Sequence, residues 1–221
     1  MTPTRLLVAG IGNIFLADDA FGPEVVKALG GRPLPGEVHV RDFGIRGLDL
    51  AYRLLDGYDA AVLVDAAPRG HRPGTLCLIE PEIPHVTDSA GHAPEAHGMD
   101  PVKVLALAAH LGDGALPRIV VLGCEPQTLP SCDADVAVGL SAPVGEAVQR
   151  AVTLLHTVVR ALLLDPAAPL SFGHTDEFGA APPARPPADP AGADEDRRTE
   201  PTPPPRDDGC RAHPSASKEH A

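Results

Sequence analysis

The residues of this sequence best suited to chemistry are Asp19, Asp42, Asp65 and His97. Each aspartate follows or ends an apolar run, and His97 precedes a helical pattern on a long loop. In open α/β sheets, ligands gather beyond the carboxyl ends of the strands. Two carboxylates and one imidazole, with further positions open to water or substrate, suit a divalent metal that takes part in a reaction.

Each of these residues also has a simpler interpretation. Asp18 or Asp19 could cap the first helix and complement its dipole. Adjacent helical side chains point about 100° apart, so the two cannot share one role. Asp65 could serve only as a turn residue. A loop histidine is more often solvated than metal-bound, and spacing does not distinguish the three on this loop, His85, His92 and His97.

A nucleotide site is the weakest alternative. Gly10 and Gly12 could hold phosphate at a helix start, but Phe15 occupies the place of the third glycine in the dinucleotide fingerprint. Asp18 and Asp19 beside the helix start would repel phosphate. The sequence also lacks a phosphate-binding G-x-x-x-x-G-K-[ST] loop and a G-x-S-x-G nucleophile elbow.

Hydrophobic patterns predict the elements that must position these residues. Apolar runs predict strands at 5–9, 37–43, 60–66, 75–80 and 118–124. Helices are predicted at 20–29, 48–55, 100–111 and 141–163. This β-α-β-α-β-β-α-β-α order predicts an α/β fold: a three-layer αβα sandwich around a mostly parallel five-stranded sheet, in which strand 75–80 is antiparallel.

Composition divides the chain near residue 165. Residues 166–221 contain no Val or Ile, one Leu and 12 of the 26 prolines. Such a segment cannot bury enough apolar surface to offset its chain entropy. The sequence therefore predicts a folded domain at 1–165 and a disordered, Pro-rich acidic tail at 166–221.

Charge and cysteine usage narrow the class of protein. The net charge is −12, and the sequence has no stripe of Lys and Arg that could contact phosphate groups. We therefore expect no nucleic-acid partner. Neither a signal peptide nor a run of about 20 apolar residues is visible, so we expect a cytoplasmic protein without a membrane partner. Cys77 and Cys124 lie inside predicted strands and are expected to be core thiols.

Several sequence blocks, in the right order, resemble the endopeptidases that mature the large subunit of nickel-iron hydrogenases. The opening LLVAGIGNIFLADDAFGPEVVKAL is similar to the family's first strand, G-x-G-N loop, acidic pair and first helix. It is followed by DFGIRGLDLAYRLL, VLVDA, HGMDPVKVLALA, VVLGCEP and GLSAPV. The resemblance covers residues 5 to about 163.

The resemblance implies that Asp19, Asp65 and His97 are the metal ligands, and it singles out His97 among the loop histidines. It implies a nickel-dependent endopeptidase of the aspartyl type that removes the C-terminal extension of the hydrogenase large-subunit precursor. The nickel is the one already inserted in the precursor, and another divalent metal could replace it in vitro. The family pattern also implies a monomer.

Two departures from the family pattern bear on the site. Asp19 stands where many relatives carry the longer Glu. Asp42 is followed by Phe43-Gly44, which keeps only the acid and the second glycine of the usual Asp-Gly-Gly-Thr. Asp42 therefore remains a candidate catalytic or substrate-binding carboxylate beside Asp19 and Asp65. The main alternative function is a non-catalytic nickel-binding assembly factor that binds the precursor without cutting it.

Overall fold

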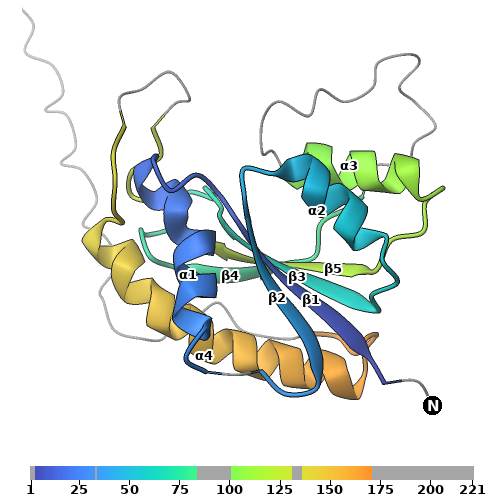
Figure 1. The fold of residues 1–221 in the computed structure, drawn as a ribbon. Coiled ribbons are helices and arrows are strands. Elements are labelled where there is room, and N and C mark those ends of the chain that lie inside the picture. The colour runs from blue at the N-terminus through green and yellow to red at the C-terminus, as the bar shows by residue number, and fades with distance from the viewer. Residues whose placement is uncertain (1–2, 33, 84–100, 131–135, 171–221) are drawn as a thin grey trace, which may run out of the picture. The chain divides into compact units, whose positions relative to one another are not determined.

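The computed structural model describes residues 3–32, 34–83, 101–130 and 136–170, which all fall within the unit 1–180 (Figure 1). The predicted ligand His97 and the alternatives His85 and His92 lie outside the described residues. So does the tail from residue 171 onward, and the domain boundary predicted at residue 165 stays a prediction.

A five-stranded sheet with the order β2-β1-β3-β5-β4 forms the middle layer. Its strands are β1 (Arg5–Ile11), β2 (Glu37–Gly44), β3 (Ala60–Ala66), β4 (Leu76–Ile79) and β5 (Arg118–Cys124). β1 pairs in parallel with β2 and β3, and β3 pairs in parallel with β5. β4 runs antiparallel to β5. The structure confirms the predicted strand directions.

Within the described residues, four α-helices cover the two faces of the sheet (Figure 1). α1 (Phe21–Leu29) and α4 (Ala142–Leu164) pack on one face, and α2 (Gly47–Leu54) and α3 (Pro101–Leu111) pack on the other. Along β3, Val62 and Val64 join the core under α1 and α4, while Ala61 and Leu63 join the opposite core. Covering on both faces explains why this strand reads as a continuous apolar run. The predicted three-layer α/β fold is confirmed.

A short 3₁₀ helix, η1 (Ala17–Ala20), precedes α1 and was not predicted from the sequence. The first turn of α1 then lies directly on the sheet backbone. A Cβ placed on Gly22 would come within 2.2 Å of the Ile11 carbonyl oxygen and 2.3 Å of the Val64 carbonyl oxygen. Only glycine permits this approach, which sets η1 and α1 against β1 and β3.

Helix α4 is long and apolar enough, by length and composition alone, to cross a membrane. No membrane-spanning segment is predicted from the sequence, in which polar residues interrupt this stretch. Nine of its side chains are buried, and those of Val152, Leu155 and Val159 are fully covered. Packing against the sheet accounts for this apolar character, since a buried core helix is hydrophobic over much of its surface.

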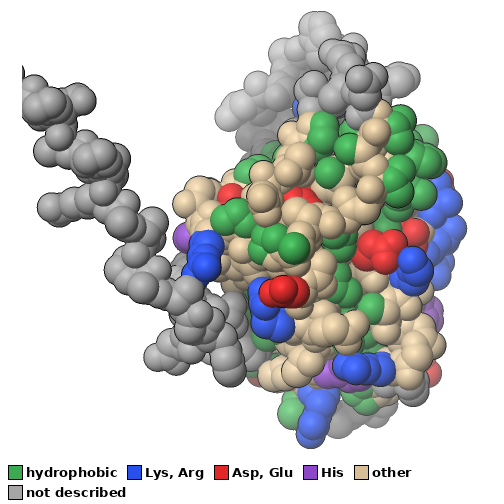
Figure 2. All heavy atoms as spheres, turned by 90° about the vertical axis from the view of Figure 1, so that its left-hand side faces the viewer, with side chains coloured by type: hydrophobic (Ala, Val, Ile, Leu, Met, Phe, Trp, Pro, Cys, Tyr) green, Lys and Arg blue, Asp and Glu red, His purple; other side chains and the backbone are tan. Residues whose placement is uncertain are grey.

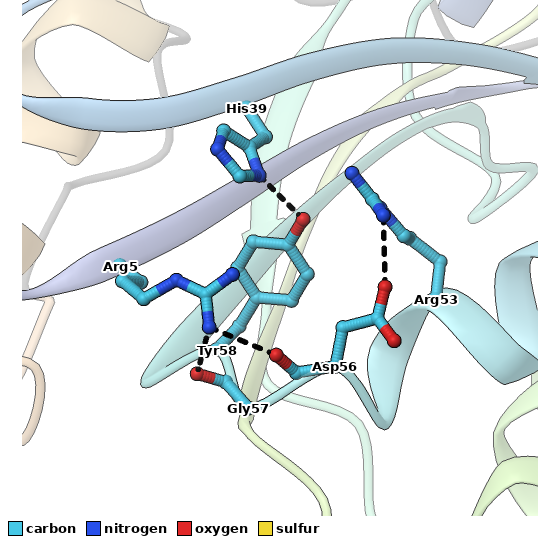
Figure 3. Close-up of polar contacts among 6 residues, drawn as sticks. All are labelled: Arg5, His39, Arg53, Asp56, Gly57 and Tyr58. Atoms are coloured by element: carbon cyan, nitrogen blue, oxygen red, sulfur yellow. Dashed lines mark hydrogen bonds and ion pairs between the residues drawn. The ribbon is translucent and has the colours of Figure 1, made fainter.

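The amino end of the sheet is closed by a polar cluster around Tyr58, which Figure 3 shows. The Tyr58 hydroxyl and His39 Nδ1 are hydrogen-bonded at 2.7 Å. The Arg5 guanidinium lies over the Tyr58 ring and donates to the carbonyls of Asp56 and Gly57 at 2.9 and 3.2 Å. These contacts fasten β1, β2 and the turn before β3 at the end of the sheet opposite the candidate site.

Candidate functional site

The strand order reverses between β1 and β3. β1 leads through α1 to β2 on one side, and β2 leads back through α2 on the other face to β3. In such sheets the crevice at this topological switch point is the usual ligand site. Asp19 lies in η1, which follows β1 and contacts β3, and Asp65 is the penultimate residue of β3. The structure therefore brings these two predicted residues to one edge of the sheet.

Asp42 lies at the same edge on the neighbouring strand. In the sheet register Asp42 pairs with Gly10, and Gly10 pairs with Val64, the residue before Asp65. The Asp42 side chain is exposed, and its Oδ1 accepts the Gly44 N–H at 2.8 Å. β2 and β3 flank β1, so Asp42 stands one strand beyond the switch point.

The carboxylate of Asp19 is half-buried beside the glycine loop. The Asn13 N–H donates to its Oδ2 at 2.6 Å, and the Asn13 side chain in turn accepts the Phe15 N–H at 3.0 Å. Burial raises the pKa of Asp19, and the hydrogen bond from Asn13 partly offsets that rise. A nearby cation would stabilise this partly desolvated carboxylate. The environment therefore fits the predicted metal-ligand role of Asp19.

Asp65 is 8% exposed and pairs with Gly123 of β5 in the sheet register. Among the described residues, no three His, Cys, Asp or Glu side chains come together as a metal site. The predicted site needs His97, which lies outside those residues. The metal ligands and the nickel thus stay predictions, although Asp19 and Asp65, two of the three predicted ligands, lie at the expected edge of the sheet.

Asp18 and Asp19 have different environments, as expected for adjacent helical residues whose side chains point in different directions. The interpretation of Asp18 as a cap of the first helix is wrong, because α1 has Ala20 as N-cap and no side-chain cap bond. Asp18 is fully buried, and its carboxylate accepts hydrogen bonds from Gln127, Thr128 and Ser141. It joins the first loop to the start of α4.

Glu125 is a buried carboxylate at this edge that the sequence analysis missed. It directly follows β5 and is 6% exposed. Its Oε2 accepts the Arg69 N–H at 2.7 Å, and its Oε1 accepts the Gly70 N–H at 3.2 Å. Glu125 thereby holds the loop that follows Asp65. The rule applied to Asp65, an acid at the carboxyl end of a buried strand, would have found it.

An apolar groove of about 610 Å³ adjoins η1 on the side of α1 and α4. Its lining includes Ile14, Phe15, Ala20, Val138, Leu140 and Val148. Ile14 and Phe15 are 48% and 53% exposed. Figure 2 looks onto this side of the molecule and shows several patches of hydrophobic side chains separated by a few charged ones.

The two described cysteines are unsuited to nucleophilic chemistry. Cys124 is fully buried, and burial raises the pKa of its thiol to about 12. Burial also raises the pKa of Cys77. Because the thiolate is the reactive form, both behave as the core thiols expected from the sequence.

These features define a three-layer α/β protein with acidic residues at the topological switch point of its sheet. The family model for hydrogenase maturation proteases matches residues 23–158. The chain is 30% identical over 155 residues to the hydrogenase expression/formation protein HupD of Rhizobium leguminosarum bv. viciae, an alignment that covers 69% of this chain and 75% of that protein.

A further relative and a solved structure point to the same family. The coenzyme F420 hydrogenase subunit delta of Methanothermobacter thermautotrophicus is 31% identical over 157 residues, 68% of this chain and 92% of that protein. The structure of the hydrogenase maturating endopeptidase HybD from Escherichia coli superposes with a TM-score of 0.56 at 26% identity, covering 72% of this chain and 93% of that one. The chain belongs to the hydrogenase maturation protease family, which confirms the resemblance seen in the sequence.

Proposed function

We propose that this protein removes the C-terminal extension of the nickel-loaded large-subunit precursor of a nickel-iron hydrogenase. Family membership supports hydrolysis of peptide bonds in hydrogenase maturation. The observation that carries the proposal is that η1, which holds Asp19, contacts β3, which holds Asp65 near its carboxyl end, beside the switch point between β1 and β3. We further propose that it acts as a cytoplasmic monomer.

The nickel belongs to the substrate in this proposal. Asp19 and Asp65, together with His97, complete the coordination of the nickel that the precursor already holds. Carboxylate and imidazole donors are compatible with a divalent nickel ion. By binding this ion the enzyme fixes the register of the scissile bond, which is the template role of a metal in catalysis.

Hydrolysis needs a water molecule whose oxygen attacks the scissile carbonyl carbon, while the C–N bond breaks and the leaving amine takes up a proton. Asp42 is our candidate for the general base that accepts the proton of this water, because its exposed carboxylate lies at the same edge of the sheet. Asp18 is unsuited to the task, since four hydrogen bonds occupy its buried carboxylate.

The test is to incubate the full chain with the nickel-loaded large-subunit precursor, with the nickel-free precursor as control, and to follow the mass of the subunit. We expect a C-terminal peptide to be lost from the nickel-loaded form alone. Asp19→Asn, Asp65→Asn and His97→Ala should abolish this loss. Glu37→Gln should not, because Glu37 is exposed at the amino end of β2.

The other outcomes are equally informative. Binding of the nickel-loaded precursor without cleavage would replace the protease proposal with the assembly-factor alternative. If the precursor is neither bound nor cut, the proposed substrate is wrong.

A further inference from the structure

The residue two positions before Asp19 has an unusual backbone conformation. Ala17 has a φ of +47°, and the one other non-glycine residue with positive φ in the described ranges is Asp113. Aspartate tolerates the left-handed region because its short polar side chain can bond locally, whereas alanine has no such compensation. A strained residue persists only where its surroundings over-determine it. The contacts around Ala17 must therefore enforce this conformation.

Asp18 makes the contacts that can do so. Its Oδ2 accepts the N–H groups of Gln127 and Thr128, both at 2.8 Å, and the Ser141 hydroxyl at 2.9 Å. Its Oδ1 accepts the Ser141 N–H at 2.7 Å. All four donors are more than 100 residues away in the sequence. Moving this fully buried carboxylate would break hydrogen bonds and leave a buried charge without partners, which is costly. The four donors therefore fix the position of the Asp18 side chain.

Backbone hydrogen bonds reinforce the same junction. The Ala17 N–H donates to the Ala137 carbonyl, the Ala137 N–H donates to the Phe15 carbonyl at 2.9 Å, and the Asp18 N–H donates to Thr128 at 3.3 Å. The chain on both sides of Ala17 is thus attached to the segment between β5 and α4.

We propose that Asp18 is a positioning residue that directs Asp19 toward the candidate site. A 3₁₀ helix has three residues per turn, so consecutive side chains point about 120° apart. With the Asp18 carboxylate fixed in the interior, the Asp19 side chain turns outward to the Asn13 N–H. The proposal rests on the proposed function, because Asp19 is the group that it positions.

A purely structural role makes a different prediction. If Asp18 only stabilised the fold, its loss would lower the melting temperature and leave the hydrogen bond between Asn13 and Asp19 in place. The amide proton of Asn13 separates the two roles, because its chemical shift and its hydrogen exchange report that bond directly.

The experiment compares Asp18→Asn and the milder Ser141→Ala with the wild type. Asparagine has only one acceptor oxygen for the donors around it, and Ser141→Ala removes one donor of four. We expect about tenfold faster exchange of the Asn13 amide in Asp18→Asn, with a smaller change of the same sign in Ser141→Ala. On the nickel-loaded precursor, kcat should fall about 10²-fold in Asp18→Asn, as for a misplaced reacting group.

Val159→Ala is the matched control. Val159 is fully buried in α4 and belongs to the core rather than the site, so its truncation lowers the melting temperature without touching Asp18. At temperatures equally far below each variant's melting point, this control should keep the Asn13 signal and kcat of the wild type. Equal losses in Val159→Ala would overturn the proposal.

The two proposals fail in different ways. An unchanged Asn13 amide in both Asp18→Asn and Ser141→Ala overturns the positioning role even if the wild type cuts the precursor. Should Asp18→Asn fail to fold, Ser141→Ala decides the question alone. Should the wild type not cut the precursor, the proposed function fails, and the Asn13 amide still decides whether Asp18 orients Asp19.

Discussion

Gly12 lies so close to Asp19 that a Cβ on Gly12 would come within 1.8 Å of the Asp19 carbonyl oxygen. The φ of Gly12 is +127°, which L side chains rarely adopt. The glycine loop and η1 are therefore in backbone contact, and this contact places Asp19 at the switch point.

Gly12→Ala should consequently destabilise the protein by more than about 3 kcal/mol, because both the contact and the φ are incompatible with a methyl group. Gly31→Ala is the matched control: nothing lies within 4 Å of its Cβ position, and its φ is outside the left-handed region. Its effect should stay within about 0.5 kcal/mol. Urea unfolding of both variants measures the difference, and equal midpoints would contradict the contact.

Asp19→Asn should make the protein more stable at neutral pH. Burial raises the pKa of Asp19 above its ordinary value of 3.8, so the folded chain holds this proton more tightly than the unfolded chain. Stability is then lost as the pH rises from 3.8 through the folded pKa. Asparagine cannot ionise, and its oxygen can still accept the Asn13 N–H.

Melting temperatures across pH 3 to 8 provide the measurement. The gain in Asp19→Asn should be present at pH 7 and vanish near pH 3, while the exposed Glu37→Gln should show no such gain. A lower melting temperature for Asp19→Asn at pH 7 would mean that the Asp19 charge is stabilised in the fold.

Much of the fold was predictable because burial on both faces leaves a strong signal. β3 and β5 occur at the predicted residues, 60–66 and 118–124, since both run through the core as continuous apolar segments. η1 was missed because four residues are too few to show a helical period. The left-handed conformation of Ala17 could not be predicted, because Gly, Asn and Asp are the residues that commonly adopt it and alanine does not indicate it.

The site was predictable only in part. An acid at the end of an apolar run marks Asp65 from local sequence alone. The role of Asp18 could not be read in this way, because three of its four donors are backbone N–H groups, which any residue except proline provides. Glu125 carries the same local signal as Asp65, because it directly follows the apolar strand β5.

Glu125→Gln should destabilise the protein by about 1–3 kcal/mol, the usual cost of leaving a buried polar group unsatisfied. A glutamine has one acceptor oxygen for the two N–H donors of Arg69 and Gly70, and its NH₂ group would face the other donor. Glu82→Gln is the control, since Glu82 is exposed. Denaturant unfolding tests both, and equal stabilities would show that the Glu125 hydrogen bonds contribute nothing net.

Cys124 should resist alkylation in the folded protein. The pKa of its thiol, raised to about 12, leaves almost no thiolate at pH 7.5, and its side chain is fully covered. Cys77, half-buried with a raised pKa, should react slowly. Iodoacetamide labelling followed by peptide mass analysis, with and without guanidinium, measures both. Labelling of Cys124 at the same rate in both conditions would contradict its burial.

Asp42→Asn tests the proposed general base. Asparagine can still accept the Gly44 N–H, so the melting temperature should change little. With the nickel-loaded precursor, kcat should fall about 10²-fold or more, while KM stays near the wild-type value because binding is retained. A normal kcat for Asp42→Asn would show that Asp42 is not the general base and only ends its strand.

The hydrogen bonds of Asp18 also set an order of events during synthesis. Asp18 leaves the ribosome early, but its partners Gln127, Thr128 and Ser141 follow more than 100 residues later. Contacts of such long sequence separation cost loop-closure entropy, and they cannot form before both partners have been synthesised. The growing chain can thus build β1, β2 and β3 while Asp18 still lacks these donors. A chain synthesised in this order can complete the contacts around Asp18, and with them the junction beside Asp19, only after Ser141 has been added.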